Sequence, residues 1–502
     1  MLVVLSLMAL LRRNTRPPDA LGAALCAVLL FDPSATLSAG FWFSFTAVAV
    51  IYISLLSRGD DQRLADKADR VVRIRSVLAG WLHLQLYISL IMLPLTLFMF
   101  QQASLVAPLA NLILIPYVSL LVVPVLLLAL VVVTFSNQLA DMLFTVAAWL
   151  LDLVWPLLSA LSELSYASIN NGTITLAETI LATAAIVMLL LNGKVFATAR
   201  MRVVLVCTAS LVVTYCLFQD RQPVLDGEFR LAVLDVGQGS AAVIETADHV
   251  MIFDTGASYG DKADSGRNIV LPYLYSRGID SPDMLVISHG DLDHIGGAGS
   301  LLRRFPSLQL TGQQLDSLAG LADGGGHCEQ GISWQWDGVY FEFLSPPAVP
   351  AAASEAGQPD NNDLSCVLKV SSPTGSVLLT GDIERKSEIR LVREYGDSLS
   401  ADILLVPHHG SNTSSSAAFI SRVEPQISII SAGYMNRYHH PHDQVLQRYM
   451  AHTRSHRLFR TDRHGAVIVE AGRHGYRVQS WRETARRYWH GALSQDGDRQ
   501  VF

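Results

Sequence analysis

The chain has 502 residues, of which 50% are hydrophobic and only 16% are charged. Soluble domains carry about 25% charged residues, so this composition excludes a protein that lies wholly in water. The formal net charge of -7 gives no sign of the general positive field of DNA-coating proteins, although a local basic groove stays compatible with it. The charge deficit is local, because charged residues form only short patches before about residue 218 and return at ordinary density after it.

This change in composition predicts a membrane part followed by a soluble part. The expected divisions are a helical membrane domain at 1–218, a linker at 219–227, a soluble α/β domain at 228–480 and a C-terminal tail at 481–502. The first apolar run, "MLVVLSLMALLRR", carries its basic residues after the run, which is not the order of a signal peptide. We therefore expect a helical bundle that is incomplete at its N-terminus.

The membrane part contains apolar runs of the length that a bilayer requires. A spanning helix needs about 20 mainly apolar residues. This criterion predicts seven or eight helices, at 1–11, 20–38, 40–57, 78–100, 104–134, 139–162, 175–193 and 203–218. The run at 104–134 carries Pro108, Pro116 and Pro124, and it is either one kinked span or two short ones.

Basic residues gather in three predicted loops, at 12–16, 58–76 and 194–202. The positive-inside rule places such loops in the cytoplasm. If 104–134 crosses the membrane once, the three loops agree and the last span, 203–218, runs outward. The soluble part is then expected outside the cytoplasmic membrane.

Two of the five cysteines, Cys328 and Cys366, lie in the soluble part. They are either two free thiols or one disulfide. A disulfide would indicate an oxidising compartment, in agreement with the predicted topology.

Four predicted strands of the soluble part end in side chains that can bind metal ions. "MLVIS" leads into "HGDLDH", "GSVLLTGDIE" ends at Asp382, "ADILLVPHHG" ends at His408 and His409, and "ISIISAGYMNRYHHPH" leads to His440. Open sheets hold their sites at the carboxyl ends of strands, so we expect these side chains to converge. A polar turn with capping side chains is the alternative for "HGDLDH" alone, and the other three strand ends argue against it.

The residues of "HGDLDH" suit a pair of divalent ions. Imidazole and carboxylate are the usual ligands of an ion that keeps an open coordination position. His289 and Asp291 can face one ion, Asp293 and His294 can face a second, and Asp382 can bridge them. Two ions about 3.5–4 Å apart clamp the attacking and leaving oxygens of a phosphodiester.

These motifs carry a resemblance to known families. "FDTG", "HGDLDH", "TGD" and "HHGS" resemble the metallo-β-lactamase superfamily. "LDVGQGS", "NDLSCVL", "VPHHGSNTSS" and "AGYMNRYHHPH", with "LLFDPSATLSAGFWFSFTAVA" in the membrane part, resemble the ComEC family of DNA-uptake proteins more narrowly. The resemblance implies a polytopic α-helical membrane bundle followed by an α/β metallo-β-lactamase-like αββα sandwich. Family members carry further N-terminal segments, so it also implies an N-terminally truncated chain.

The resemblance implies a role for each site residue. The expected metal ligands are His289, Asp291, Asp293, His294, Asp382, His408 and His440. The expected catalytic residues are Asp293, Asp382 and His409, while Asp235 and Asp254 would support the ligand loops from behind. Many superfamily members have His at the position of Asp291, and the Asp favours Mn²⁺, with Zn²⁺ as the alternative. No clear His stands at a strand end between Gly297 and Asp382, because His327 lies in a loop-like stretch.

The resemblance further implies a place and a function. It implies a multi-pass protein of the bacterial inner membrane that admits single-stranded DNA, with a two-metal nuclease domain on the periplasmic side that degrades the other strand. The expected partners are single-stranded DNA, membrane lipid, a DNA receptor and a DNA-translocating motor. Two alternatives stay open: a DNA-binding transport component with an inactive metal domain, and a membrane-tethered metallo-hydrolase of another ester or lactam. The sequence gives no oligomeric state.

Overall fold

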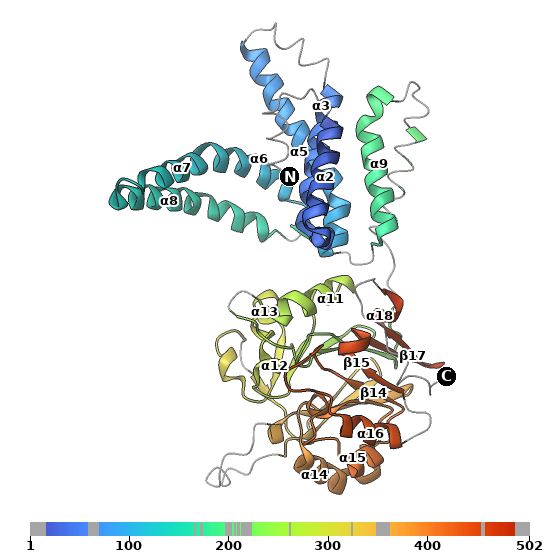
Figure 1. Ribbon diagram of the computed structural model, residues 1–502. Helices are drawn as coiled ribbons and strands as arrows, with labels where there is room; N and C mark the ends of the chain where they lie inside the picture. The colour runs from blue at the N-terminus through green and yellow to red at the C-terminus, as the bar shows by residue number, and fades with distance from the viewer. Residues whose placement is uncertain are drawn as a thin grey trace. The chain divides into compact units, whose positions relative to one another are not determined.

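The computed structural model describes residues 17–58, 70–164, 167–170, 174–195, 223–260, 263–322, 325–347, 362–452 and 457–486, with four further residues between 203 and 211. The chain divides into two compact units, one of Met1–Arg221 with Tyr275–Gly278 and the other of Gln222–Leu274 and Ile279–Phe502 (Figure 1). The predicted span at 1–11 lies outside the described residues, and the span at 203–218 lies largely outside them. Of the predicted linker at 219–227, residues 223–227 are described.

The first unit is helical. Its elements are α2 (Pro17–Phe31), η1 (Pro33–Leu37), α3 (Ala39–Arg58), α5 (Arg70–Phe100), β1 (Gln102–Ser104), α6 (Ala107–Tyr117), η2 (Val118–Val122), α7 (Val123–Val132), α8 (Asn137–Ser162), β2 (Ser168–Asn170) and α9 (Leu176–Val195). Within the described ranges, three helical stretches are long and apolar enough to cross a membrane: Ala79–Phe100, Ala107–Val132 and Asn137–Ser162. Pro18–Phe31, Ala39–Ser54 and Leu176–Met188 are shorter apolar helices.

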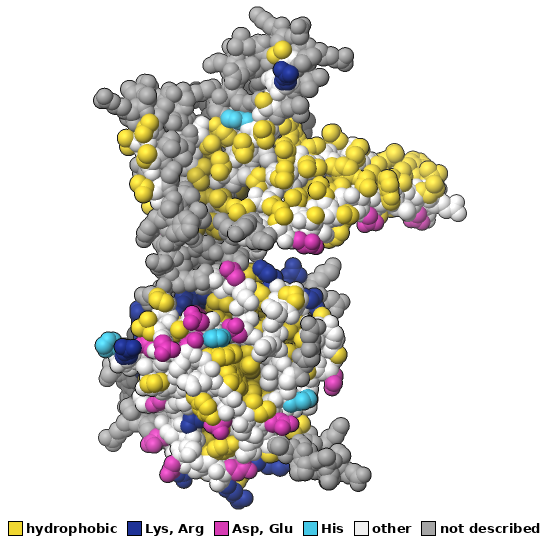
Figure 2. Space-filling view, turned by 180° about the vertical axis from the view of Figure 1, so that it is seen from behind, with side chains coloured by type: hydrophobic (Ala, Val, Ile, Leu, Met, Phe, Trp, Pro, Cys, Tyr) yellow, Lys and Arg dark blue, Asp and Glu magenta, His cyan; other side chains and the backbone are white. Residues whose placement is uncertain are grey.

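The run predicted at 104–134 forms one helical stretch rather than two. α6, η2 and α7 follow one another directly, and η2 is a π turn that lies between Pro116 and Pro124. Proline lacks the N–H of the helical ladder, and a π turn is one way to absorb the break. α7 and α8 then form a hairpin (Figure 1), and hydrophobic side chains cover most of its visible surface (Figure 2). The structure thus favours one kinked span.

The predicted span at 20–38 is wrong in its extent. α2 ends at Phe31, where a carboxylate oxygen of Asp32 accepts a hydrogen bond from the backbone N–H of Ser34 at 3.0 Å. A residue that precedes a proline disfavours the helical conformation, so α2 does not continue through Asp32. Pro33 then begins the 3₁₀ helix η1. The predicted loop at 58–76 is also shorter than expected, since α5 already begins at Arg70.

The second unit contains the strands β3 (Phe229–Val233), β4 (Ala242–Glu245), β5 (Val250–Phe253), β6 (Met284–Ile287), β7 (Gln309–Gly312), β8 (Gly325–His327), β9 (Ser333–Trp336), β10 (Val339–Ser345), β11 (Val367–Ser372), β12 (Gly375–Leu379), β13 (Ile403–Leu405), β14 (Ile427–Ile430), β15 (Arg457–Arg460), β16 (Val467–Gly472) and β17 (Gly475–Ser480). Its helices are η3 (Gly266–Val270), α11 (Leu271–Ser276), α12 (Leu292–Ile295), α13 (Ala298–Arg304), η4 (Leu315–Leu318), η5 (Asn362–Leu364), α14 (Arg385–Tyr395), η6 (Gly396–Leu399), η7 (Pro407–Gly410), α15 (Ala417–Val423), α16 (Asp443–His452), α17 (Thr461–His464) and α18 (Trp481–Thr484).

These strands form two packed sheets. Among the described residues, the first sheet has eight strands in the order β17-β16-β3-β4-β5-β6-β7-β8, and the second has seven in the order β15-β14-β13-β12-β11-β10-β9. Apolar side chains of both sheets, among them Leu231, Phe253, Phe341 and Leu379, share one buried core. α14, α15 and α16 cover the outer face of the second sheet, and α11 and α13 lie against the first (Figure 1). This arrangement confirms the predicted αββα sandwich.

The topology brings the candidate site residues to one edge. β5, β6 and β7 run parallel in the first sheet, and β12, β13 and β14 run parallel in the second. The carboxyl ends of β6, β12, β13 and β14 therefore deliver "HGDLDH", Asp382, "HHGS" and the "AGYMNRYHHPH" loop. A disulfide joins Cys328, which follows β8, to Cys366, which precedes β11, and so links the two sheets.

The C-terminal tail begins as part of this unit. α18 follows β17 directly, and Arg482 donates hydrogen bonds to the Asp462 carbonyl oxygen and to the Asp235 carboxylate. Residues 487–502 of the predicted tail lie outside the described residues.

Candidate metal centre

The "HGDLDH" segment combines a short loop with one turn of helix. β6 ends at Ile287, and Asp291 is the N-cap residue of α12, so Asp293 and His294 lie in the helical turn itself. Successive side chains of a helix point about 100° apart, which lets Asp293 and His294 reach different neighbours.

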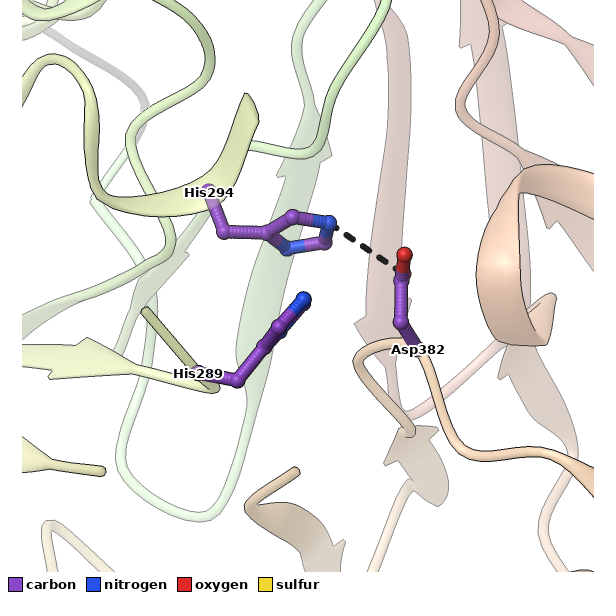
Figure 3. Close-up of side chains that lie close together, drawn as sticks. All are labelled: His289, His294 and Asp382. Carbon is purple, nitrogen blue, oxygen red and sulfur yellow. Dashed lines mark ion pairs between the residues drawn. The ribbon is translucent and has the colours of Figure 1, made fainter. Parts of the chain in front are cut away.

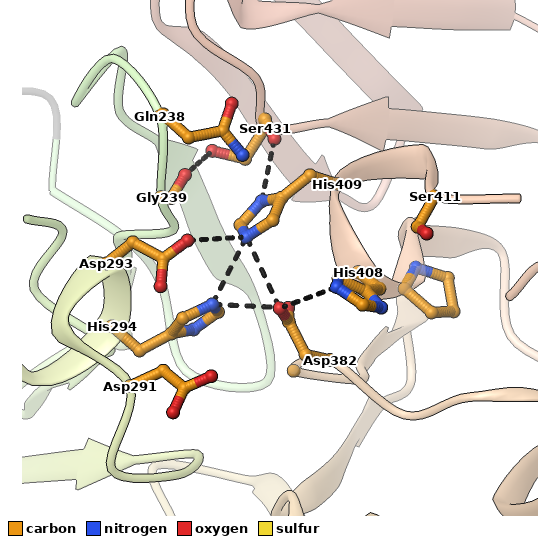
Figure 4. A network of polar contacts seen from close by, with 12 residues as sticks. Gln238, Gly239, Asp291, Asp293, His294, Asp382, His408, His409, Ser411 and Ser431 are labelled. Carbon is orange, nitrogen blue, oxygen red and sulfur yellow. Dashed lines mark hydrogen bonds and ion pairs between the residues drawn. The ribbon is translucent and has the colours of Figure 1, made fainter. Parts of the chain in front are cut away.

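Two groups of donors lie close enough to hold metal ions. The ligand atoms of His289, His294 and Asp382 lie within 4.8 Å of one another, and so do those of Asp293, His294 and His409. His294 belongs to both groups, and its Nε2 lies 3.2 Å from Asp382 Oδ1 (Figure 3). His409 Nε2 lies 3.4 Å from Asp293 Oδ2 and 3.4 Å from Asp382 Oδ2 (Figure 4).

Asp254 and Ser288 fix the orientation of two of these imidazoles. The fully buried Asp254 accepts hydrogen bonds from the Ser288 N–H at 2.7 Å, from the Ser288 hydroxyl at 2.8 Å and from His294 Nδ1 at 2.7 Å. Because the Ser288 hydroxyl donates to Asp254, its oxygen is free to accept from His289 Nδ1 at 3.0 Å. Both rings thus carry their proton on Nδ1 and turn Nε2 toward the other donors.

His409 is held in the same way by the second sheet. Its Nδ1 donates to the backbone carbonyl of Ser431 at 2.9 Å, and the Ser431 hydroxyl donates to the Gly239 carbonyl at 2.7 Å (Figure 4). A carbonyl oxygen can only accept, so the proton of His409 lies on Nδ1 as well. Three imidazoles therefore present Nε2 to one small volume.

This donor set fits divalent cations. The buried Nε2 of His289 has no hydrogen-bond partner, and buried polar atoms rarely stay unsatisfied. His294 Nε2 and His409 Nε2 face each other at 3.2 Å, an approach of two lone pairs that requires a proton or a cation between them. Mixed imidazole and carboxylate ligands are those that catalytic zinc and manganese sites use.

The electrostatics of the donors agree with this assignment. Burial would lower the pKa of His409, but Asp382 and Asp293 outweigh it and raise that pKa to about 9. Burial would raise the pKa of Asp382, but His294 and His409 hold it well below its usual value. For Asp293, burial is likewise outweighed by His409 and His294, which lower its pKa. The negative field that retains protons on these imidazoles is a field that attracts cations.

The other predicted ligands lie around the donor groups. The half-exposed Asp291 places Oδ2 3.5 Å from His289 Nε2. His408 Nε2 lies 3.7 Å from Asp382 Oδ2, and His408 Nδ1 lies 3.4 Å from Glu384. The structure thus places His409, expected to be catalytic, among the donors, and His408, expected to be a ligand, at their partly exposed rim.

His440 lies beside His408 and His409, and it is in neither of the two donor groups described above. Its ring centroid lies 6.4 Å from that of His409 and 5.9 Å from that of His408. Burial and the neighbouring His409 and His408 lower the pKa of His440 to about 4. Its imidazole is therefore neutral near pH 7, as a ligand must be.

The contacts of Asp235 and the position of His327 differ from what the sequence predicted. Asp235 accepts from Arg482 at 2.8 Å and from the Gly237 N–H at 3.4 Å, so it secures the tail and the "VGQGS" turn rather than a ligand. His327 ends the strand β8 rather than lying in a loop, and it is in neither donor group of the described residues.

Sequence reasoning missed three positioning residues: Ser288, Ser431 and Gly239. Gly239 has φ +131°, and a Cβ there would lie 2.3 Å from the Asp293 carbonyl oxygen. The neighbouring Ser240 N–H donates to that same oxygen at 3.1 Å. The glycines of "LDVGQGS" were the available signal, since an isolated glycine at a strand end often marks a close backbone approach.

Comparisons with known proteins find matches to both units of the chain. Residues 1–196 match the competence protein family model, and residues 234–316 match the metallo-beta-lactamase superfamily model. The chain is 34% identical over 93% of its length to "Competence protein ComA" of Neisseria gonorrhoeae, of which it covers 60%. It is 30% identical to "Uncharacterized protein YcaI" of Escherichia coli (strain K12), over 93% of this chain and 57% of that protein. It is also 30% identical to "Recombination protein 2" of Haemophilus influenzae, over 89% of this chain and 57% of that protein.

The chain spans about three fifths of the length of these curated relatives, in which 57% to 60% is covered. The match nevertheless runs through both units, so that the helical competence domain and the metal-binding fold occur together and in the same order. The chain therefore combines a competence domain with a following metallo-beta-lactamase superfamily domain, and it is similar to competence proteins over nearly its whole length.

Proposed function

We propose that the second unit is a metal-dependent phosphodiesterase that cuts DNA, and that the whole chain acts in DNA uptake at a bacterial membrane. The observation that carries the proposal is the pair of donor groups that share His294 at the joined edge of the two sheets. Two adjacent ion sites are the arrangement that stabilises both the attacking and the leaving oxygen of a phosphodiester.

The donor residues would divide between two divalent ions. His289, His294 and Asp382 would hold one ion, with Asp291 as a further ligand. Asp293 and His409 would hold the other, and Asp382 would lie between the two. The three carboxylates favour Mn²⁺ over Zn²⁺ because they are hard ligands. When bound, the ions would supply Lewis-acid activation of water and of the phosphodiester oxygens.

The protein's own residues would orient the substrate around these ions. His408 is partly exposed beside Asp382, so its Nε2 can turn to donate a hydrogen bond to a phosphate oxygen. Asp254 and Ser431 keep the imidazoles fixed, so that little reorganisation is needed when the phosphodiester arrives. His440 would close the second ion's coordination or contact the leaving strand.

The proposal extends to the membrane. We infer that the helical unit, residues 1–218, admits one DNA strand across the inner membrane while the second unit, residues 228–480, degrades the other on the periplasmic side. The three long apolar helices support membrane insertion, and the buried Cys328–Cys366 disulfide supports an oxidising compartment. A DNA receptor, a DNA-translocating motor and membrane lipid are the proposed partners, and the match of residues 1–196 to the competence protein model supports a role beside other competence proteins.

A substrate screen tests the proposal. Purified full chain in detergent micelles would be given single-stranded DNA, double-stranded DNA and a chromogenic lactam, with Mn²⁺ and then with Zn²⁺. We expect cleavage of DNA and no turnover of the lactam, and loss of cleavage in Asp382→Asn. Lactam turnover without DNA cleavage would instead assign a membrane-tethered hydrolase, and metal binding without any turnover would assign a binding domain.

A further inference from the structure

A loop beside the metal centre exposes an unusual set of side chains. The loop follows β14 and comprises residues 433–440; we call it the aromatic loop. Tyr434 is 74% exposed, Met435 is 84% exposed and Tyr438 is 46% exposed. Adjoining exposed apolar side chains commonly mark a binding surface, because folding alone gives no reason to leave them in water.

The aromatic loop is held in a defined shape. The Asn436 side chain donates to the Gly433 carbonyl at 2.9 Å and to the His440 carbonyl at 2.6 Å, and it accepts from the His440 N–H at 2.9 Å. A Cβ at Gly433 would lie 2.7 Å from the Gln238 nitrogen, so the base of the loop packs tightly on the "VGQGS" turn. Its exposed rings are thus presented at a fixed place, which lowers the entropy cost of binding.

The loop is continuous with the metal centre through a series of rings. The Tyr438 and His440 rings stack with their centroids 5.7 Å apart and an interplanar angle of 24°. The His440 and His409 rings are also nearly parallel, at 22°, with centroids 6.4 Å apart. The guanidinium of Arg437 lies 4.7 Å from the centroid of the Tyr438 ring. A row of ring faces therefore connects the exposed loop to His409, one of the candidate metal donors.

We propose that the aromatic loop is a stacking platform for one or two unpaired bases next to the phosphodiester that the metal centre cuts. The assignment rests on the proposed function. Bases stack on aromatic rings whatever their sequence, and an arginine beside the rings neutralises backbone phosphates. A paired base has both faces covered by its neighbours in the duplex, so the platform would select a single-stranded region.

Binding of a single-stranded oligonucleotide tests this proposal without cleavage. The full chain in detergent micelles would be titrated into a fluorescent dT oligonucleotide with Ca²⁺ in place of Mn²⁺, and the anisotropy recorded. Removing a stacking ring costs roughly fivefold to 150-fold in affinity. We expect a loss in that range for Tyr434→Ala and Tyr438→Ala together, and near wild-type binding for Tyr434→Phe and Tyr438→Phe, which keep the rings.

Two controls make the outcome specific to stacking. Tyr340→Ala removes a tyrosine that is 43% exposed on β10, where it pairs with Ser371 away from the metal centre, and it should leave the affinity unchanged. An oligonucleotide of abasic sites should bind the wild type more weakly, and the paired alanine variant should no longer distinguish it from dT. Tyr434→Ala alone removes a ring that is exposed to solvent, so loss of folding cannot explain its effect.

The outcomes separate this inference from the proposed function. Unchanged binding in the alanine variants, or a variant that still distinguishes abasic DNA, would overturn the platform even if the chain cuts DNA. Binding of anionic lipid vesicles through these tyrosines, with no binding of dT, would overturn it as well and assign a membrane contact. Tyrosine-dependent binding of dT by a chain that never cuts would support the platform and contradict the nuclease.

Discussion

Replacing Asp254 by asparagine tests how the protein prepares its metal donors. The carboxylate is fully buried and accepts from the Ser288 N–H, the Ser288 hydroxyl and His294 Nδ1, at 2.7, 2.8 and 2.7 Å. Asparagine keeps one acceptor oxygen but presents an NH₂ group to the remaining donors. One donor must then stay unsatisfied, or His294 must move its proton to Nε2, the atom that would bind the ion.

The size of the effect follows from these contacts. An unsatisfied buried donor costs about 1–3 kcal/mol, and loss of a carboxylate behind a ligating imidazole typically weakens metal binding by about 10-fold to 100-fold. We therefore expect Asp254→Asn to raise the dissociation constant for Mn²⁺ by about 10-fold to 100-fold. A titration of the purified full chain against a fluorescent chelator measures this directly, whether or not the chain is active.

Asp337→Asn is a matched control for this substitution. Asp337 also accepts from a hydroxyl, a backbone N–H and a histidine Nδ1, supplied by Thr246, Asp248 and His249 at 2.7, 2.8 and 3.0 Å. None of its partners is a metal donor, so the affinity for Mn²⁺ should stay at the wild-type value. Equal affinities in wild type, Asp254→Asn and Asp337→Asn would refute the argument that Asp254 orients His294.

Three further predictions concern the surrounding fold. Gly239→Ala should abolish DNA cleavage because its Cβ would meet the Asp293 carbonyl at 2.3 Å, whereas Gly260→Ala, at φ +127° with nothing within 4 Å, should retain it in the same end-labelled assay. Cys366→Ser should lower the unfolding free energy by about 4 kcal/mol, since the disulfide closes a loop with a sequence separation of 38, and a thermal melt would show the loss. Burial would raise the pKa of Asp337, but its hydrogen bonds lower it to about 2, so its contribution to stability should be complete above about pH 4 and lost as the pH falls toward 2 in acid titrations against Asp337→Asn.

Each of these three predictions has a contradicting result. Equal activity of the two alanine variants would show that the clash at Gly239 is relieved elsewhere. For the disulfide, a reducing agent should lower the melting temperature of the wild type and leave that of Cys366→Ser unchanged; equal shifts in both would place the effect elsewhere. For Asp337, a constant difference in melting temperature between wild type and Asp337→Asn from pH 5 down to about 2 would contradict the predicted loss of stability as the carboxylate is protonated.

The sequence predicts which strand ends supply the site better than it predicts the contacts among the side chains there. Apolar strands that end in Asp or His are local patterns, so the gathering of His289, Asp382 and His409 at one edge follows from the sequence and the rule that ligands bind at strand carboxyl ends. The roles of His408 and His409 could not be separated in this way. Both lie in η7 with left-handed φ values of 48° and 55°, and the carbonyl of Ser431, which follows β14, selects His409 for the donor group.

The missed features depend on contacts between segments that are distant in sequence. Ser431 is 192 residues from the Gly239 carbonyl to which it donates, and no local pattern reports that pairing. The end of α2 was missed for a different reason. A hydropathy window averages over Asp32 and Pro33, whereas the chain uses them to stop the helix.

Cleavage of end-labelled DNA by the purified full chain is the direct test of the proposed nuclease. With Mn²⁺ present, we expect the wild type to cut single-stranded DNA and Asp293→Ala to lose that activity, because Asp293 Oδ2 and His409 Nε2, 3.4 Å apart, would no longer share an ion. A wild-type chain that binds metal but cuts no DNA in Mn²⁺ or Zn²⁺, or an Asp293→Ala variant that cuts as well as the wild type, would contradict a metal-dependent nuclease at this site.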